Sequence, residues 1–137
     1  MINEIMLNLE IVTPEKRVLS ETVDSVTVPT ESGEVGILTN HAPLISSLKS
    51  GILSYAKGGA VEKMVVAGGF VEVSANNVSV LADTVEMANE IDVEAARIER
   101  ETAEKSLGAW KGSEEEFEIE KERLEKAQAR LQLASGR

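Results

Sequence analysis

The sequence predicts an α+β chain in two segments: an N-terminal antiparallel β-sandwich, or flattened barrel, followed by a C-terminal antiparallel two-helix hairpin. Apolar residues alternate with a period near two as far as Ala82, with turn residues between the runs. From Ile91 they recur at every third or fourth position, which is the period of a helix. We therefore expect two domains, a β-sandwich over residues 1–88 and a helix-turn-helix unit over residues 89–137.

Short runs rich in Val, Ile and Thr account for the first segment. Strands are expected at Met6–Val12, Lys16–Ser20, Thr22–Pro29, Glu34–Leu38, Ile52–Lys57, Glu62–Ala67, Gly69–Ser74 and Val78–Asp83. Short strands at this spacing are typical of a sandwich or barrel.

Two turns link these strands through residues that accept positive φ at low cost. They are Lys-Gly-Gly-Ala at residues 57–60 and Ala-Asn-Asn at residues 75–77, and each predicts an antiparallel hairpin. Tyr55 and Phe70 are the aromatic residues before the helical segment. The core is therefore expected to consist mainly of Val, Ile and Leu.

Each of the two expected helices has one narrow apolar stripe. The first stripe, interrupted by one arginine, comprises Val93, Ala96, Arg100, Ala103, Leu107 and Trp110. Gly112 is expected to end the first helix, and Ser113 with Glu116 forms a capping box that begins the second. The second stripe comprises Phe117, Leu124, Ala127, Leu131 and Ala134.

The alanines in these stripes predict a weakly packed hairpin. Burying an alanine removes much less apolar area from water than burying a leucine, at roughly 25 cal/mol per Å². Strong helix formers fill both segments, so each helix can persist while its packing partner changes. A unit of this kind can switch between a folded-back and an extended arrangement, the latter reaching roughly 60 Å at about 1.5 Å per residue.

Composition argues against several classes of partner. The net charge of −10 disfavours nucleic acid and anionic membrane surfaces, because both require a basic face. No run approaches the roughly 20 apolar residues of a membrane span, so no direct membrane insertion is expected. Without cysteine the chain has no disulfide and no thiolate metal site. The first residues lack the pattern of a signal peptide, and the chain is expected to stay in the compartment where it is made.

No catalytic residues and no metal site are predicted. The glycine pairs at 58–59 and 68–69 lack the spacing and the following Lys-Ser/Thr of a phosphate-binding loop. His41 is the only histidine, and nothing in the sequence places a serine beside it. Consecutive glutamates at 114–116 are explained as an acidic first helical turn, which suits the helix dipole.

Five runs carry a family resemblance: Ile-Val-Thr-Pro-Glu at 11–15, the stretch from Gly33 to Leu44, Gly68 to Val73, Val-Ser-Val-Leu-Ala at 78–82, and Ile-Asp at 91–92. In these runs the chain resembles the epsilon subunit of the bacterial rotary (F-type) ATP synthases, from about Leu7 to the C-terminus. The resemblance implies a non-catalytic subunit of the central stalk. In that family the sandwich docks on the gamma shaft and the c-subunit ring, and the hairpin can extend and inhibit ATP hydrolysis.

Carried onto this chain, the resemblance implies that the loop bearing Glu34 meets the c ring, and that His41, Ala42, Pro43 and Leu44 belong to the surface facing the gamma subunit and the ring. The alternative is structural: glycines and a proline shape a turn, and His41 is a hydrogen-bonded loop histidine.

Some members of the family also bind ATP with the folded hairpin, through an Ile-Asp-x-x-Arg-Ala motif. Here Ala95 stands where the motif has arginine, and Arg97 lies two positions later on another helix face. The residues compatible with nucleotide binding are Glu86, Ile91, Asp92, Lys126 and Arg130. A triphosphate requires concentrated positive charge. We therefore expect no cofactor, with ATP at most a weak regulatory ligand, and the alternative role for Asp92 is a helix N-cap.

The second helix carries the basic residues Lys121, Arg123, Lys126 and Arg130. By the same resemblance, they pair with acidic segments of the alpha and beta catalytic subunits when the hairpin extends. The alternative is a solvated face with intrahelical pairs such as Glu122 with Lys126.

The resemblance thus implies a subunit that works at the cytoplasmic face of the bacterial inner membrane and is held there through its complex, which is proton-driven or, less often, sodium-driven. The alternative from another class is a freestanding ATP-sensing or ligand-binding sandwich with a helical dimerisation tail.

Overall fold

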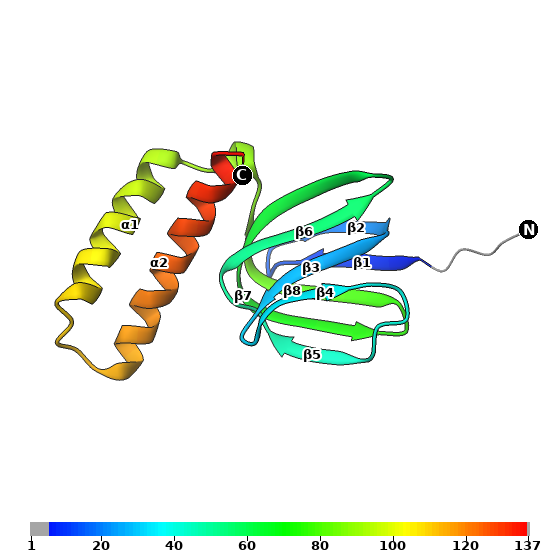
Figure 1. Cartoon of the computed structure of the whole chain (residues 1–137), viewed down its shortest axis with the longest axis horizontal. Helices are drawn as coiled ribbons and strands as arrows, with labels where there is room; N and C mark the ends of the chain where they lie inside the picture. The colour runs from blue at the N-terminus through cyan, green and yellow to red at the C-terminus, as the bar shows by residue number, and fades with distance from the viewer. Residues whose placement is uncertain (1–5, 137) are drawn as a thin grey trace, which may run out of the picture.

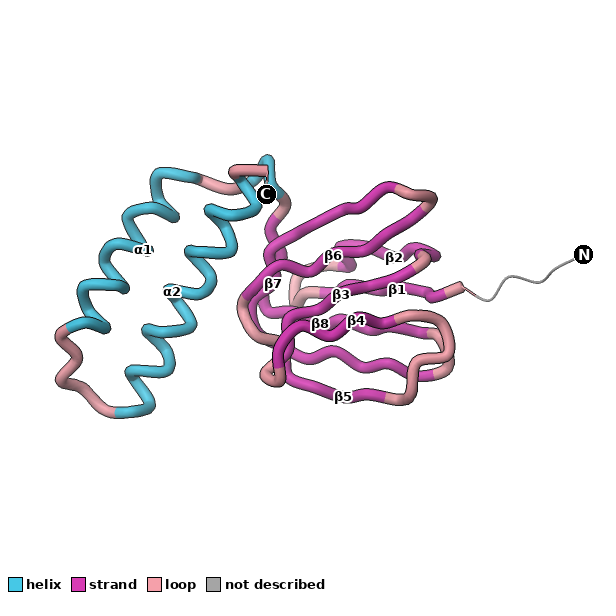
Figure 2. The backbone as a smooth tube through the Cα atoms, in the orientation of Figure 1, coloured by secondary structure: helices cyan, strands magenta, loops and turns pink. Residues whose placement is uncertain are grey.

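The computed structural model describes residues 6–136, so residues 1–5 of the predicted first domain and residue 137 of the second lie outside the described residues. Within this range the chain forms a head of eight strands and a hairpin of two α-helices at its side (Figure 1). The elements are β1 (Leu7–Val12), β2 (Arg17–Val23), β3 (Ser25–Thr30), β4 (Gly33–Ile37), β5 (Leu44–Ser47), β6 (Gly51–Lys57), β7 (Ala60–Ser74), β8 (Asn77–Glu86), the 3₁₀ helix η1 (Ala88–Glu90), α1 (Val93–Gly108) and α2 (Glu114–Ala134). Figure 2 shows this separation of strands from helices, which confirms the predicted fold class.

The strands form one connected sheet in the order β2-β1-β8-β7-β6-β3-β4, with β5 paired to β7. The strand pairs are antiparallel except β1 with β8, which is parallel. The sheet is not closed into a barrel, because β2 and β4 remain at the two ends of the strand order. Of the two forms named from the sequence, the sandwich is the one that describes this head.

A bend in β7 folds the sheet over its own core. Gly68 and Gly69 have φ of +67° and +100°, in the left-handed region that glycine tolerates. Before the bend β7 pairs with β6, and after it with β5, while β8 accompanies both halves. A Cβ on Gly69 would lie 1.8 Å from the Leu81 carbonyl oxygen. The close approach of β7 to β8 therefore depends on glycine.

The interior of the head is aliphatic, as predicted. Alternate residues of each strand point inward, so that Leu7, Leu9 and Ile11 of β1 are at most 1% exposed. Val, Ile and Leu from the other strands complete the cluster, and Tyr55 is the aromatic member among the described residues.

The strand boundaries differ from the prediction in three places. β2 runs on to Val23 and the break falls at Asp24, whereas the sequence suggested a break near Glu21. The segments predicted at 62–67 and 69–74 are one bent strand, and the short β5 was missed. The two predicted hairpin turns are confirmed, with positive φ at Gly58, Gly59, Ala75 and Asn76.

The helix starts are as predicted, but one helix end is not. The Asp92 carboxylate accepts the Ala95 amide (3.0 Å) and caps α1, and the Ser113 hydroxyl accepts the Glu116 amide (3.1 Å) and caps α2. Helix α1 ends at Gly108, so the prediction that Gly112 ends it was wrong. Gly112 instead leaves room for the indole of Trp110, whose Nε1 donates to the Ser113 carbonyl (3.0 Å).

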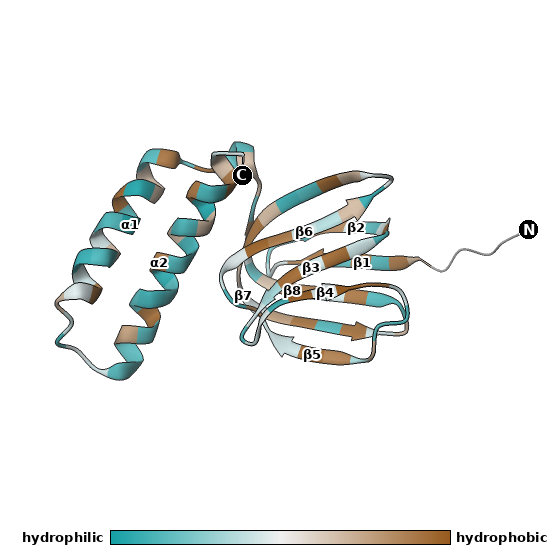
Figure 3. Ribbon diagram, viewed as in Figure 1, coloured by the Kyte–Doolittle hydropathy of each residue, from teal (hydrophilic) through white to brown (hydrophobic). Residues whose placement is uncertain are grey.

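Small side chains line the contact between the helices. Ala96 and Ala103 of α1 and Ala127 of α2 are fully buried, and Trp110 meets Phe117 edge-to-face near the turn, with centroids 5.8 Å apart. Helix α2 in turn rests on the sheet through Ala129 and Leu133, which pack on Val65 of β7. The hairpin is therefore folded back on the head, and its surface is mostly hydrophilic (Figure 3).

Candidate functional site

Three of the predicted rotor-contact residues line two separate hollows. Glu34 of β4 is exposed and lines a cleft of about 560 Å³ between the sheet and α2, opposite Glu125 and Gln128. Pro43 and Leu44 line another hollow beside β5 and β7. The structure therefore does not bring Glu34 into one site with residues 41–44.

The segment that carries His41 is held by hydrogen bonds. The His41 ring Nδ1 lies 2.7 Å from the Ala42 carbonyl oxygen, and the His41 amide donates to the Leu38 carbonyl (3.2 Å). The preceding Asn40 has φ +64° and its amide donates to the Asn76 side chain (2.7 Å), which ties this loop to the turn between β7 and β8. Ala42 and Pro43 remain exposed, so the loop presents a fixed, accessible surface.

An apolar row on the outer face of the sheet was missed from the sequence. Phe70 and Leu81 pair across β7 and β8, and Leu81 is also in register with Val12 of β1. Phe70 is 56% exposed and Leu81 is 55% exposed. With Pro14 they line a hollow of about 330 Å³, and Asp83 lies at its side. We call Val12, Pro14, Phe70 and Leu81 the apolar row.

The alternation of inward and outward residues along β7 and β8 could have predicted this apolar row. In β7 the inward positions are Val71 and Val73, which puts Phe70 on the outer face, and the same phase in β8 puts Leu81 there. A large apolar residue in the outward phase of two neighbouring strands is the pattern of a contact surface.

Two of the candidate nucleotide residues bind each other. The guanidinium of Arg130 donates to both carboxylate oxygens of Glu86, from Nε at 2.7 Å and from Nη2 at 3.2 Å. Glu99 of α1 lies 3.7 Å from the same guanidinium. The positive charge of Arg130 is thus already compensated within the chain.

Two of the other three nucleotide candidates are engaged within the fold. The Asp92 carboxylate caps α1, which is the alternative role that the sequence left open. Ile91 packs against the Val65 cluster. Lys126 lines a cleft of about 360 Å³ together with Asp83, Glu99, Glu122 and Arg123, so carboxylates outnumber cations there, which is unfavourable for a phosphate.

Arg97, which stands near the position of the motif arginine, is used on the surface of α1. It pairs with Glu94 and, at 3.0 Å, with Glu101. The hydrogen bond and charge of Glu94, with a smaller contribution from Glu101, raise the pKa of the Arg97 guanidinium. Its side chain is 46% exposed and faces solvent.

The four basic residues of α2 do not form one patch in the folded-back hairpin. Lys121 and Arg123 are exposed, and Arg123 lies 3.7 Å from Glu120. Lys126 and Arg130 are half-buried on the side toward α1 and the sheet. Among the described residues Glu122 does not pair with Lys126, and the pair within α2 is that of Arg123 with Glu120.

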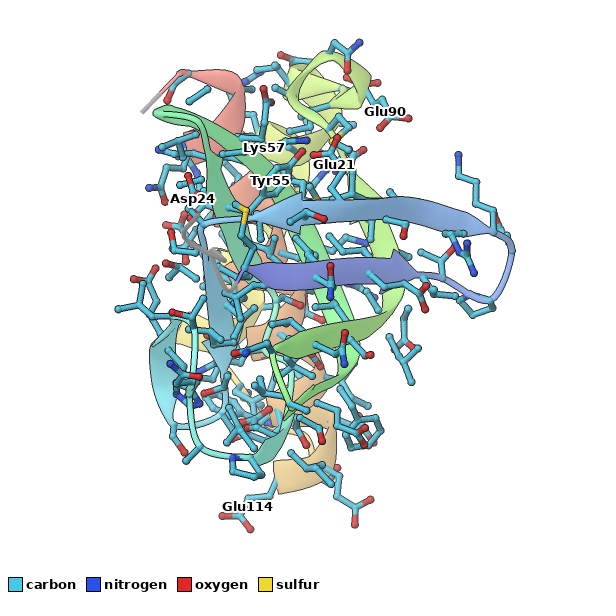
Figure 4. The ribbon with its side chains drawn as sticks, turned by 90° about the vertical axis from the view of Figure 1, so that its right-hand side faces the viewer. Glu21, Asp24, Tyr55, Lys57, Glu90 and Glu114 are labelled. Carbon is cyan, nitrogen blue, oxygen red and sulfur yellow. The ribbon has the colours of Figure 1, made fainter. Side chains whose placement is uncertain are left out.

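The charged group around Tyr55 serves the fold. Figure 4 shows Tyr55 and Lys57 beside Glu21 and Asp24. Lys57 lies 3.6 Å from Glu21, and the Asp24 carboxylate accepts the Gly58 amide (3.0 Å). Burial, followed by the charges of Glu21 and Glu62, raises the pKa of Tyr55. These contacts fix the β6–β7 hairpin to the corner between β2 and β3.

Comparison with known proteins decides the family. Residues 6–88 match the family described as ATP synthase, Delta/Epsilon chain, beta-sandwich domain, which is more than half of the chain. The chain belongs to this ATP synthase delta/epsilon family. The resemblance seen in the sequence is therefore confirmed.

Bacterial ATP synthase epsilon chains match the helices of this family member as well as its sheet. The chain of Desulforamulus reducens is 47% identical over 126 residues, covering 92% of this chain and 95% of the relative. That of Anaeromyxobacter sp. (strain K) is 45% identical over 128 residues, covering 93% and 97%.

Solved structures carry the same fold in assembled ATP synthases. A chain of the Euglena gracilis mitochondrial ATP synthase structure, described as OSCP/F1/c-ring, matches with a TM-score of 0.80 and 26% identity, over 95% of this chain and 81% of that one. A chain of the Tetrahymena thermophila mitochondrial ATP synthase central stalk/c-ring matches with a TM-score of 0.65 over 95% and 94%, and at 17% identity it supports the fold alone. Among residues 6–136, none of the helices has the length and apolar character to cross a membrane.

Proposed function

We propose that this epsilon-family chain is a non-catalytic subunit of the central stalk of a proton-translocating ATP synthase. Its head couples the gamma shaft to the c ring, and its helices inhibit ATP hydrolysis. The family match and the order of the elements, a head of strands followed by a two-helix hairpin, support this role. The complex acts at the cytoplasmic face of the bacterial inner membrane, and the chain is held there through its partners.

The apolar row is the surface by which the head grips the gamma subunit. Phe70 and Leu81 are the exposed part of the apolar row, and the buried core of the sheet fixes their position. Exposed apolar surfaces of this kind are typical of contacts between proteins. The loop at residues 41–44 belongs to the surface that faces the gamma subunit and the ring, and Glu34 at the start of β4 contacts polar loops of the c ring. Since the structure separates these two places, the ring contact is extended over the head rather than concentrated at one residue.

Co-purification of variants with the gamma subunit tests the grip on the shaft. Phe70→Ser and Leu81→Ser are each expected to weaken binding about tenfold or more, because they remove apolar area from the centre of the contact. The matched control is Val61→Ser, which removes a 57% exposed apolar side chain from the other half of β7. Binding of both variants at the level of the control would contradict the proposal.

The narrow seat of the hairpin supports a role as a brake. Helix α2 contacts the sheet along a ridge at Ala129 and Leu133, with a cleft on either side lined by polar residues. A partner can shift the equilibrium between the folded-back and extended hairpin only by the difference in its affinity for the two states. The free energies of the two states must therefore differ by no more than a few kcal/mol. When extended, the basic side chains of α2 meet acidic segments of the alpha and beta subunits.

Removal of residues 92–137 from the assembled enzyme tests the brake. Hydrolysis of ATP is expected to rise several-fold, because the inhibitory helices are gone while the head remains. The control is the assembled enzyme with the full chain, measured at the same subunit stoichiometry. Unchanged hydrolysis would end the brake proposal and leave the coupling role standing.

ATP is proposed to be at most a weak ligand of the hairpin. Arg130 is already paired with Glu86 and Glu99, and the motif arginine is replaced by Ala95. Calorimetric titration of the isolated chain should give little heat. Tight ATP binding together with a stable isolated dimer would instead favour a freestanding sensor.

A further inference from the structure

Arg130 is largely enclosed in the folded-back hairpin, with 13% of its side chain exposed. It sits on α2 at the point where three elements meet. Glu86 reaches it from the end of β8, and Glu99 reaches it from α1. One carboxylate thus belongs to the head and the other to the hairpin itself.

The bond to Glu86 differs from the other ion pair between hairpin and head. Two guanidinium nitrogens donate to the two carboxylate oxygens, Nε to Oε1 and Nη2 to Oε2, and this fork geometry is stronger and more directional than a single contact. Lys49 also reaches α2, at 2.9 Å from Glu125, but its side chain is 36% exposed and an exposed pair contributes little. The Glu125 hydrogen bond and charge raise the pKa of Lys49.

The apolar part of the same contact is small. Val65 meets Ala129 and Leu133, with Ile52 and Ile91 at the edge. An apolar contact of this size holds α2 close to the sheet but does not fix its orientation, because alanine buries little area and makes no directional interaction. The two hydrogen bonds between Arg130 and Glu86 fix the orientation of α2 that the apolar contact leaves undefined.

We propose that Arg130 is the positioning residue of the folded-back hairpin, held by an internal latch of two carboxylates, Glu86 on the head and Glu99 on α1. Since both carboxylates belong to the chain, the latch closes without an external ligand. In this proposal Glu86 and Arg130 bind each other instead of binding a nucleotide. The consequence for hydrolysis rests on the proposed function, whereas the latch itself is a property of the isolated chain.

Distance measurement on the full chain tests the latch. The chain has no cysteine, so Lys63→Cys and Gln128→Cys, which line one cleft from β7 and α2, place two spin labels at unique positions. Electron resonance in nucleotide-free buffer then gives the ratio of undocked to docked hairpins. The labelled parent is expected to be mainly docked. In that background Arg130→Gln is expected to raise the ratio about tenfold or more, as loss of charged hydrogen bonds implies.

Two further variants make the result specific. Glu86→Gln is expected to have a similar effect, and combining it with Arg130→Gln should add little, because the first substitution has already removed the bond. The matched control, Arg97→Gln, removes a guanidinium that pairs with Glu94 and Glu101 within α1 and should leave the ratio within twofold of the parent. Arg130→Lys keeps the charge without the fork, and an intermediate ratio is expected.

Three results would overturn the latch: a mainly undocked parent without nucleotide, an Arg130→Gln ratio within twofold of the parent, or fully additive effects of the two substitutions. Far-UV circular dichroism checks that the helices persist. If Arg130→Gln loses helix, Arg130→Lys decides, and a ratio equal to the parent's counts against the latch. Undocking by Arg130→Gln with unchanged hydrolysis in the assembled enzyme would refute the brake and leave the latch intact.

Discussion

Gly69 permits the close approach of β7 to β8. Its φ of +100° is strained for an L-residue, and an added Cβ would meet the Leu81 carbonyl oxygen at 1.8 Å. We expect Gly69→Ala to lower the free energy of unfolding by at least about 2 kcal/mol, measured by urea denaturation. Gly36→Ala is the control, since nothing lies within 4 Å of its Cβ and its φ is not positive. Equal stability of the two variants would contradict this account.

The single tyrosine reports on the burial of its strand. Burial, with Glu21 and Glu62, raises the pKa of Tyr55 above its ordinary value of 10.0. A raised pKa favours the neutral phenol in the folded chain, so this contribution to stability is complete below pH 10 and is lost as pH rises through the folded pKa. Spectrophotometric titration should give a midpoint above that of the urea-unfolded chain. Coincident midpoints would show that Tyr55 is solvated.

Substitutions of Asp92 test whether it acts as the N-cap of α1 or as a nucleotide-binding residue. Its carboxylate accepts the Ala95 amide at 3.0 Å, a role that asparagine fills as well as aspartate. Asp92→Asn should therefore leave the thermal midpoint of the hairpin nearly unchanged, whereas Asp92→Ala should cost about 1 kcal/mol. Circular dichroism at 222 nm follows both. A large loss with asparagine would mean that the negative charge itself is needed.

At the scale of elements, the helix pair depends on side chains of minimal size. Ala103 of α1 is fully buried, so a leucine there has no space and pushes the helices apart. Ala103→Leu is expected to destabilise the hairpin by about 1–3 kcal/mol. Thr102→Leu, at the exposed neighbouring position, is the matched control. Hydrogen exchange of the helix amides measures both, and equal protection would mean that the interface can repack.

Periodicity predicted the strands and helices well where local chemistry decides them. The turns at Gly58-Gly59 and Ala75-Asn76 and the caps at Asp92 and Ser113 depend on neighbours within a few residues and are present, although of the predicted capping box the structure shows the bond from the Glu116 amide to the Ser113 hydroxyl. The end of α1 did not, because Gly112 serves the packing of Trp110 rather than a helix terminus. The four-residue β5 was missed because its pairing with β7 is non-local.

At the scale of the whole molecule, the sites depend on contacts between distant segments. Glu86 and Arg130 are 44 positions apart, and no spacing in the sequence indicates that they bind each other. The apolar row joins β1, β7 and β8 through a parallel pair of β1 with β8, which a local pattern does not reveal. The alternation in the sequence was sufficient to place Phe70 and Leu81 on the outer face of the sheet, but it did not predict which strands lie side by side.

The two apolar clusters divide the molecule into parts of unequal stability. The head encloses a large cluster that includes fully buried Leu7, Ile11 and Leu53, whereas the hairpin is attached to it through Val65, Ala129 and Leu133. Undocking of the hairpin exposes little apolar area, and the undocked helices are held by their own hydrogen bonds and small alanine contacts, so their local unfolding should require at least about 2 kcal/mol less than global unfolding. Native-state hydrogen exchange should therefore place the α1 and α2 amides in a less protected group than those of β1 and β8. Equal protection of both groups would mean that head and hairpin unfold as one unit, and a hairpin bound that firmly is unsuited to act as a brake.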